Sequence, residues 1–238
     1  MSGNPITVRW LGREDYEPLW RKMQAFTNER DAGTEDELWF TEHPPVFTLG
    51  VNAAREHLLA PGDIPVVQID RGGQVTYHGP GQLMVYPLVD LKRRGLGVRA
   101  LVSALEQSVV DLLAGSEIAA AARPDAPGVY VGDKKIASVG LRIRRGASFH
   151  GMALNVDVDL EPFSRINPCG YANLELTDLK RVGAGADLDE VSERLLPHLM
   201  RHLGIGPEDV AKSARQGSRH ALSASSRSGV PTSSQGPR

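Results

Sequence analysis

Residues 128–156 read GVYVGDKKIASVGLRIRRGASFHGMALNV, and this stretch decides the fold class. It holds three runs rich in apolar and β-branched residues, separated by the turn pairs Gly132-Asp133 and Arg145-Gly146. Short runs of this kind between glycine-containing turns are typical of a β-meander. The pattern therefore predicts three consecutive strands, at 128–131, 136–143 and 149–156.

The rest of the chain adds strands in blocks and three helical segments. Strand patterns occur at 38–42, 46–50, 66–70 and 83–89. Apolar residues recur at helical spacing in 13–30, 98–113 and 188–203, and Pro197 predicts a kink or a break in the last helix. Because the strands do not alternate strictly with helices, the pattern predicts a single α+β domain, with a central mixed β-sheet flanked by helices.

Composition indicates an ordinary globular protein. The 238 residues are 41% hydrophobic and 24% charged, enough for a core of normal size. No run of about 18 apolar residues occurs, so no membrane span or membrane partner is expected. The N-terminus, MSGNP, lacks the basic and apolar regions of a secretory signal, and the chain has one cysteine. A cytoplasmic location is expected.

The C-terminal residues 212–238 differ from the rest of the chain. They contain five basic residues and no acidic ones, which leaves 22 basic against 29 acidic residues and a formal charge of −7 for the remainder. This tail is rich in Ser, Gly and Arg and has few apolar residues, so it is expected to be disordered. A solvated, dispensable tail is a better interpretation than one that binds nucleic acid or an acidic partner. The folded domain is therefore expected at 1–211, with its core at about 31–205.

The single cysteine, Cys169, lies in the sequence Ile166-Asn-Pro-Cys-Gly-Tyr171. A buried structural cysteine usually lies in an apolar strand or helix, whereas this one stands between a proline and a glycine. A thiol on such a turn is open to a ligand, which favours a nucleophile that forms a covalent intermediate. An inert loop cysteine is the alternative from this sequence alone.

A glycine-rich cluster, RGGQVTYHGPGQ, spans residues 71–82 and directly follows a predicted strand. Its backbone can approach a ligand closely, and its N–H groups are candidates to hold a carbonyl oxygen, an oxyanion or a phosphate. It lacks the Gly-Lys-Ser/Thr ending of a P-loop and does not match the dinucleotide fingerprint. The presence of Arg71, His78 and Gln82 favours a binding site over a plain glycine-rich hairpin.

Two further clusters contain polar residues beside predicted strands. In Gly132-Asp-Lys-Lys-Ile-Ala-Ser138, position alone favours solvated turn lysines at both Lys134 and Lys135. In the strand at 149–156, a lone His150 is by itself typical of a satisfied core histidine, and the adjacent Gly151 permits close approach of a substrate chain. No spacing of acidic, His and Cys residues suggests a metal site, so neither a metal nor a cofactor is expected.

Four ordered motifs together resemble the lipoyl(octanoyl) transferase family of the biotin/lipoate protein ligase superfamily. They are residues 71–82, 132–138, 149–156 (FHGMALNV) and 166–170 (INPCG). The resemblance runs in order from about residue 6 to 205 and excludes the tail. It shows no departure at these motifs, and it implies the biotin/lipoate ligase-like catalytic fold.

The resemblance implies a two-step acyl transfer. An octanoyl group passes from octanoyl-acyl carrier protein to Cys169, and then to a lysine of a lipoyl domain in 2-oxoacid dehydrogenases or the glycine cleavage H protein. It further implies that Lys135 pairs with Cys169 as a catalytic residue. The acyl pocket that it implies consists of Arg71, Gly72, Gly73, Gln74, Val75, Thr76, Tyr77, His78, Ala137, Ser138, Val139, His150, Gly151 and Met152.

Three other functions stay open at this point. An ATP-dependent lipoate or biotin ligase shares the implied fold but needs no cysteine. A non-catalytic carrier-domain-binding protein needs neither the thiol nor Lys135, and a cysteine hydrolase would use His78 or His150 as its base. For any function that involves acidic protein partners, Lys92, Arg93, Arg94, Arg142, Arg144 and Arg145 are candidate docking residues, although solvated turn charges are an equal alternative.

Overall fold

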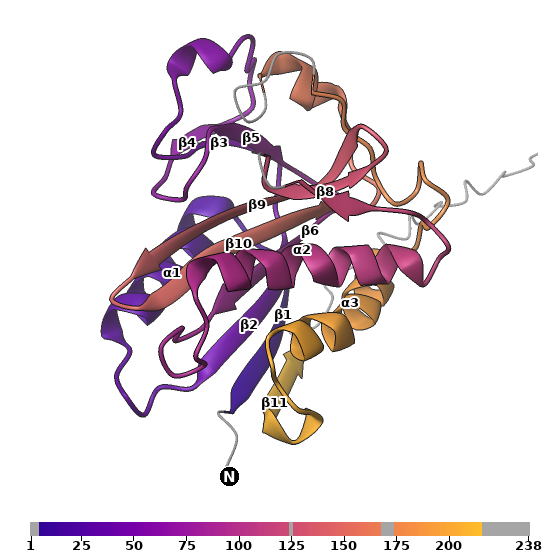
Figure 1. Cartoon of the computed structure of the whole chain (residues 1–238). Helices are drawn as coiled ribbons and strands as arrows, with labels where there is room; N and C mark the ends of the chain where they lie inside the picture. The colour runs from indigo at the N-terminus through magenta and orange to yellow at the C-terminus, as the bar shows by residue number, and fades with distance from the viewer. Residues whose placement is uncertain (1–4, 124–125, 168–173, 216–238) are drawn as a thin grey trace, which may run out of the picture.

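Eight strands form the main sheet of the computed structural model, which describes residues 5–123, 126–167 and 174–215 (Figure 1). Their order across the sheet is β11-β1-β2-β6-β10-β9-β8-β7. The strands are β1 (Ile6–Arg13), β2 (Asp36–Glu42), β6 (Gln82–Leu88), β7 (Ala121–Ala122), β8 (Gly128–Val131), β9 (Lys134–Arg144), β10 (Ala147–Asn155) and β11 (Val210–Arg215). The expected meander is confirmed, because β8, β9 and β10 are antiparallel neighbours.

The sheet is mixed, and a second sheet packs beside it. Strand β1 pairs in parallel with both β2 and β11, whereas β2, β6, β10, β9 and β8 are antiparallel in turn. The second sheet has the order β4-β3-β5 and is built from β3 (Val46–Leu49), β4 (Val66–Gln68) and β5 (Val75–His78). The α+β class with a mixed sheet is therefore confirmed.

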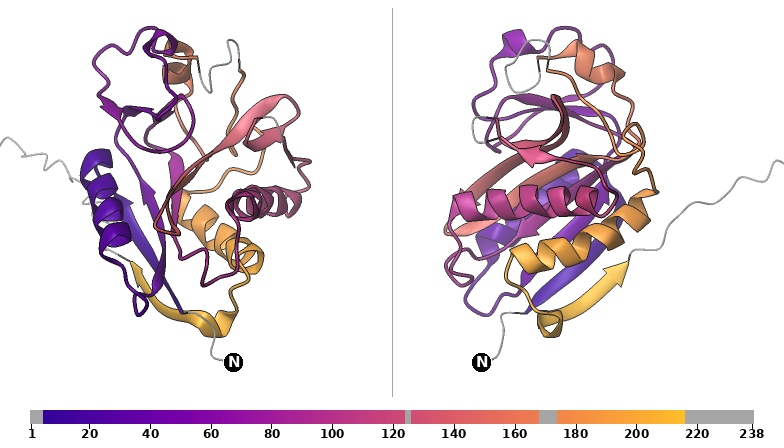
Figure 2. Two further views of the ribbon diagram at one scale, coloured as in Figure 1. Left: turned by 60° about the vertical axis from the view of Figure 1, so that its left-hand side comes forward. Right: turned by 45° about the vertical axis from the view of Figure 1, so that its right-hand side comes forward.

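Three helices cover the two faces of the main sheet, as Figure 2 shows. They are α1 (Tyr16–Glu29), α2 (Val98–Ala114) and α3 (Leu188–His202). Helix α1 buries Tyr16, Leu19, Trp20 and Met23, whose spacing follows one helical face. Each such side chain stabilises the fold by roughly 1.5–3 kcal/mol on burial. Helices α2 and α3 pack together over the opposite face, around the larger apolar cluster.

Two expectations about the C-terminal part need correction. Of the kink or break expected at Pro197, the break is wrong, because helix α3 is continuous through this residue: the proline removes one backbone hydrogen bond, while Leu195 and Leu199 stay fully buried on either side. Strand β11 extends to Arg215, past the expected domain end at 211, because β1 supplies its backbone hydrogen-bond partners. Composition alone does not reveal such pairing. Residues 216–238 lie outside the described part of the chain.

Across residues 5–123, 126–167 and 174–215, no helix is both long and apolar enough to span a lipid bilayer.

Candidate functional site

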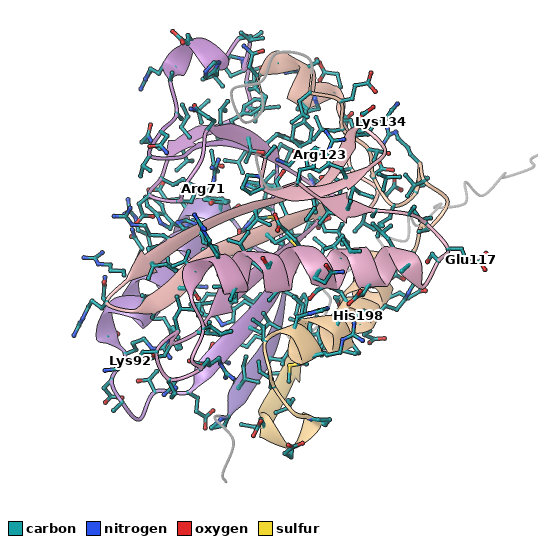
Figure 3. The ribbon with its side chains drawn as sticks, in the orientation of Figure 1. Arg71, Lys92, Glu117, Arg123, Lys134 and His198 are labelled. Carbon is teal, nitrogen blue, oxygen red and sulfur yellow. The ribbon has the colours of Figure 1, made fainter. Side chains whose placement is uncertain are left out.

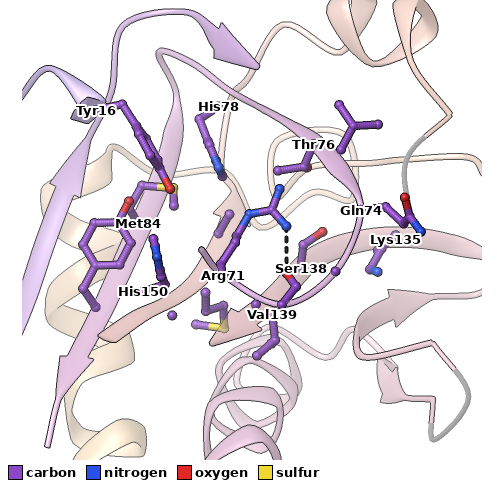
Figure 4. A pocket seen from close by; sticks show the side chains of 18 residues that line it. Tyr16, Arg71, Gln74, Thr76, His78, Met84, Lys135, Ser138, Val139 and His150 are labelled. Carbon is purple, nitrogen blue, oxygen red and sulfur yellow. Dashed lines mark hydrogen bonds between the residues drawn. The ribbon is translucent and has the colours of Figure 1, made fainter. Parts of the chain in front are cut away.

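A pocket lies where the small sheet and its glycine-rich loop meet strands β6, β9 and β10 of the main sheet (Figure 4). Most of the residues expected to bind an acyl chain line it, together with Lys135. They are Arg71, Gly72, Gly73, Gln74, Val75, Thr76, His78, Ser138, Val139, His150, Gly151 and Met152.

Two of the expected site residues, Tyr77 and Ala137, do not line this pocket. Tyr77 alternates with its neighbours on β5, so its ring packs the other way, 5.5 Å from the Phe47 ring and 5.4 Å from the Phe163 ring. Ala137 is buried in the core cluster under α2 and α3. Cys169 lies in residues 168–173, outside the described residues.

Lys135 is buried at 2% exposure, unlike the solvated turn lysine that its position favoured. Its neighbour Lys134 does follow that expectation, since its side chain is 56% exposed (Figure 3). Lys134 Nζ forms an ion pair with Glu175 Oε2 at 3.1 Å. The backbone of Lys135 donates to the Glu175 carbonyl and accepts from Thr177 N–H, at 2.9 and 3.0 Å. These bonds hold Lys135 against the chain that follows the Cys169 segment.

The Arg71 guanidinium anchors the glycine-rich loop in the small sheet. Its Nη2 donates to the Thr48 carbonyl and to Thr48 Oγ1, at 2.9 and 3.0 Å. The loop also bonds to β9, since Gly72 N–H donates to the Leu141 carbonyl at 3.0 Å. That N–H is therefore engaged within the fold, which argues against its use for a substrate oxyanion.

His78 is held as a neutral imidazole within this polar network. Its Nδ1 donates to Gln82 Oε1 at 2.8 Å, and its Nε2 accepts from Thr48 Oγ1 at 3.2 Å. Burial lowers the pKa of His78 well below its usual value, and the nearby cation Arg71 adds to this effect. Because both nitrogens are engaged, the geometry argues against His78 as a catalytic base.

The same network continues from Gln82 to the backbone of Lys135. Gln82 Nε2 donates to Asn155 Oδ1 at 2.9 Å, and Asn155 Nδ2 donates to the Thr177 carbonyl at 3.0 Å. Since Thr177 N–H in turn bonds to Lys135, one run of buried hydrogen bonds connects the glycine-rich loop with the lysine. Buried networks of this kind fix geometry when every member is satisfied. The sequence motifs at 71–82 and 149–156 meet in this network.

His150 has an unusual backbone conformation, with φ of +58°. This conformation turns its ring to the same side as Phe149, and the two rings stack at 4.9 Å although the residues are adjacent on β10. Left-handed backbone in a non-glycine residue costs on the order of 1 kcal/mol and is concentrated at functional sites. Its conformation thus distinguishes His150 from an ordinary strand histidine.

Asp70 orients the His150 ring. Its Oδ1 lies 2.9 Å from His150 Nε2. Burial would raise the pKa of Asp70, but hydrogen bonds from His150, Trp20 and Gln24 outweigh this and lower it to about 2. Burial also lowers the pKa of His150, against the influence of Asp70. A charged Asp70 and a neutral His150 follow, so Nε2–H donates to Asp70 and Nδ1 has the lone pair.

Several pocket residues were not expected from the sequence motifs. Tyr16, Met84, Tyr86, Gly140 and Ala153 also line the pocket. Tyr16 comes from α1, where its apolar periodicity marked it as core, and its ring stacks on His78 with centroids 5.4 Å apart. Tyr86 is buried on β6 and donates to His43 Nε2 at 2.7 Å. The alternation of β6 and β10 is the signal that would have placed Met84 and Ala153 on one face.

The arrangement suits an extended apolar chain with a reactive end near Lys135. The walls combine glycine backbone with Met84, Val139 and Met152, and Figure 4 shows His150 and Lys135 on opposite sides of the pocket. Gly151 allows β6 and β10 to approach closely, because a Cβ there would lie 1.9 Å from the Val85 carbonyl oxygen. Within the described residues, no group of three His, Cys, Asp or Glu side chains is placed to hold a metal.

Two of the candidate docking arginines have structural roles instead. Arg93 and Arg94 bind the carboxylate of Asp36, at 2.6 and 2.5 Å, and Arg30 joins them at 2.6 Å. Asp36 is fully buried, and the Arg94 side chain is only 4% exposed. The turn pattern gave no sign of this buried carboxylate, since it lies on β2, far away in sequence. Arg142, Arg144 and Arg145 remain exposed.

Comparisons with known proteins show the family of this chain. The family model of the lipoyl protein ligase A/B catalytic domain matches residues 15–200. The chain is 61% identical over 208 residues to the octanoyltransferase of Stutzerimonas stutzeri (strain A1501), which covers 87% of this chain and 95% of that relative. It is 59% identical over 204 residues to the octanoyltransferase of Chromobacterium violaceum, which covers 86% of this chain and 99% of that relative.

A solved structure shares the fold at much lower identity. It comes from a structural analysis of a bipartite lipoate protein ligase and its E2 lipoyl domain from Thermoplasma acidophilum. The TM-score is 0.67 at 19% identity, over 90% of this chain and 88% of that chain. This likeness concerns the fold alone.

Proposed function

Because the chain belongs to the octanoyltransferase family of lipoyl protein ligase A/B catalytic domains, we propose that it transfers octanoyl groups in two steps through Cys169. The donor is octanoyl-acyl carrier protein. The acceptor is a lysine of a lipoyl domain, as in 2-oxoacid dehydrogenases and the glycine cleavage H protein. The observation that supports this most is a fully buried lysine, Lys135, at one side of an apolar pocket.

In the first step, the Cys169 thiolate attacks the carbonyl carbon of the donor thioester. A new C–S bond forms, the bond to the carrier sulfur breaks, and the departing carrier thiolate takes its proton from the Lys135 ammonium, which leaves Lys135 neutral. A free thiol has a pKa near 8.5, and a neighbouring ammonium favours its thiolate. Lys135 supplies that ammonium. One thioester replaces another, so the step is close to neutral in free energy.

In the second step, the acceptor amine attacks the octanoyl-Cys169 carbonyl. A C–N bond forms, the C–S bond breaks, and Cys169 is released as a thiolate. The amine must give up a proton, and neutral Lys135 accepts it, since acylation has consumed the thiolate charge. An amide is more stable than a thioester, so this step drives the sequence.

Chain connectivity supports the pairing of Cys169 with Lys135. Cys169 precedes Glu175 by six residues, which span at most about 22 Å when extended. Glu175 accepts a hydrogen bond from Lys135 N–H at 2.9 Å. On the other side of the segment, Asn167 N–H donates to the His57 carbonyl at 2.8 Å. The thiol is thus tethered from both sides by chain that is fixed in the structure.

Intact-mass spectrometry tests the covalent route. Incubation with octanoyl-acyl carrier protein should add one octanoyl group to the wild type and none to Cys169→Ser. Addition of a lipoyl domain should then remove the group and place it on the domain. Transfer that proceeds without any adduct, or with Cys169→Ala given ATP and free octanoate, would instead support a ligase. Release of free octanoate would support a hydrolase.

A further inference from the structure

Helix α2 turns one carboxylate toward the core on the side of Lys135. Glu106 is 7% exposed, and its Oε1 accepts a 2.7 Å hydrogen bond from Gly128 N–H. A carboxylate at such a position loses hydration that one neutral hydrogen bond does not replace. Burial accordingly raises the pKa of Glu106, while the Gly128 hydrogen bond and the charge of Lys135 act in the opposite direction. Glu106 therefore interacts with Lys135 through its charge.

Gly128 fixes where these two side chains lie. A Cβ on Gly128 would be 2.5 Å from Lys135 Cε and 3.3 Å from Nζ, so the end of the lysine rests against this residue. Its φ of +134° also favours glycine. The same residue donates its N–H to Glu106, so the end of the lysine and the carboxylate both lie next to one glycine.

The groups packed against Lys135 come from separate elements. Glu106 approaches from α2, and the Tyr130 ring from β8, with its centroid 5.5 Å from Nζ. On the flanks, Lys134 and Glu175 pair with each other. Cys169, the proposed partner, lies outside the described residues. Among these neighbours Glu106 is the buried anion.

We infer that Glu106 is a positioning residue that stabilises Lys135 as an ammonium ion. The inference rests on the proposed function and adds a residue that the sequence motifs do not include. Taking a lone ammonium out of water is costly, and a carboxylate across Gly128 offsets this cost. Glu106 is not among the residues that line the pocket, so we assign it no contact with the acyl chain and a role through Lys135 alone.

Glu106 has opposite effects on the two transfer steps. The first step uses charged Lys135 to hold the Cys169 thiolate, so the carboxylate assists it. The second step needs neutral Lys135 to take the proton from the acceptor amine, so the carboxylate shifts that step to higher pH. A single buried charge thereby sets the pH range in which both steps proceed.

The test compares Glu106→Gln with the wild type in each step separately. The glutamine keeps an oxygen for Gly128 N–H and removes only the charge. Iodoacetamide alkylates Cys169 selectively, because it is the only cysteine in the sequence. In Glu106→Gln, the midpoint of the pH dependence of the alkylation rate should shift to higher pH. For single-turnover transfer from preformed octanoyl-enzyme to a lipoyl domain, the rise of the rate with pH should occur at lower pH in Glu106→Gln than in the wild type. A shift of about one pH unit corresponds to a tenfold change in rate at pH values well below the midpoint of each profile.

Shifts of the two pH profiles in opposite directions distinguish a charge effect on Lys135 from a purely structural role. A structural role would slow the steps or destabilise the fold without moving the midpoint of either profile. Glu117→Gln removes an exposed negative charge just after α2 and should leave both profiles in place. Profiles of Glu106→Gln that coincide with the wild type would overturn the inference, while the wild-type adduct would still support the proposed function. If Glu106→Gln fails to fold, Glu106→Asp must show the same opposed shifts at smaller size, and coincident profiles would again overturn it.

Discussion

Three histidines around the pocket are buried as neutral imidazoles, and this makes the fold sensitive to acid. His43 is the clearest, because its Nδ1 lies 2.6 Å from the Glu14 carbonyl and its Nε2 accepts from Tyr86. Burial lowers the pKa of His43 to about 4, although the Glu14 hydrogen bond and nearby carboxylates act against this. His78 and His150 are shifted in the same direction.

The sign of the pH effect follows from linkage. The unfolded chain binds a proton at His43 near pH 6.5, whereas the folded chain binds it only near pH 4. The contribution of neutral His43 to stability is complete above pH 6.5 and is lost as the pH falls from 6.5 to 4. We expect the free energy of unfolding in urea to fall by on the order of 3 kcal/mol from this residue between pH 6.5 and 4.

Urea titrations at pH values from 7.5 down to 4.5 measure this loss, with His43→Gln as the control. The glutamine variant should be less stable at pH 7.5, since it loses ring packing, but its stability should fall less steeply with pH. The stability of the glutamine variant should still fall somewhat with pH, because the pKa values of His78 and His150 are also lowered. Equal slopes in the two proteins would contradict the assignment of His43 as a buried neutral group.

The residue scale also shows what the sequence can identify. Arg71 and His78 stand in a motif dense in glycine, and both do line the pocket. Lys135 and Lys134 have indistinguishable local sequence, and only the pairing of β8 with β9 buries one and exposes the other. Tyr16 is invisible as a pocket residue, because its helical spacing looks like plain core and its partner His78 lies 62 positions away.

At the scale of elements, the contact of β6 with β10 depends on Gly151. A Cβ at this position would meet the Val85 carbonyl oxygen at 1.9 Å, which is backbone and cannot rotate away. We expect Gly151→Ala to separate the two strands and to lower the free energy of unfolding by roughly 2–3 kcal/mol or more. Because the pocket lies over this pair, octanoyl adduct formation should fall as well.

Chemical denaturation checks this expectation, and Gly33→Ala is a matched control. A Cβ on Gly33 meets only Asp31 Oδ1 at 3.6 Å, which is ordinary contact, and Gly33 lacks a positive φ. The control should therefore stay within about 0.5 kcal/mol of the wild type. A Gly151→Ala variant as stable as this control would show that the strands can adjust at no cost.

Helix α3 offers a stabilising substitution at Pro197. The proline is exposed within a continuous helix, so it removes a backbone hydrogen bond and contributes no packing in return. We expect Pro197→Ala to raise the free energy of unfolding by about 1–3 kcal/mol, reduced by the greater freedom of the unfolded chain. Thermal melts should show a higher midpoint with unchanged transferase activity, and a lower midpoint would contradict the argument.

Elements with a strong local pattern were predictable, and those defined by partners were not. The meander and the three helices have clear periodicity and turn signals. Strand β5 lies inside a glycine-rich motif that looks like a loop, and it becomes a strand only because β3 pairs with it. Strand β11 contains few apolar residues and depends on parallel pairing with β1, more than 190 positions earlier. Such long-range pairing leaves no trace in a local window.

On the scale of the whole molecule, the net negative charge of residues 1–211 opposes the binding of acidic protein partners. Residues 1–211 have a formal charge of −7, so an acidic carrier or lipoyl domain is repelled overall and needs a local basic surface. Since Arg93 and Arg94 bind Asp36, the candidates reduce to Lys92 and the β9–β10 turn region with Arg142, Arg144 and Arg145. Arg142 pairs in register with Phe149, one residue from His150 at the pocket.

We therefore expect Arg142→Glu combined with Arg144→Glu to raise the KM for octanoyl-acyl carrier protein by about tenfold at low salt, through slower association. The effect should shrink at high salt, because exposed charges are screened. Turnover of a small octanoyl thioester, which needs no protein docking, should change less than twofold. Lys180→Glu is the matched control, since it reverses one exposed charge, paired with Asp157, outside the β9–β10 hairpin. An unaltered carrier-protein KM in the double variant would exclude this surface as the docking site and leave Lys92 and its surroundings to be tested in the same way.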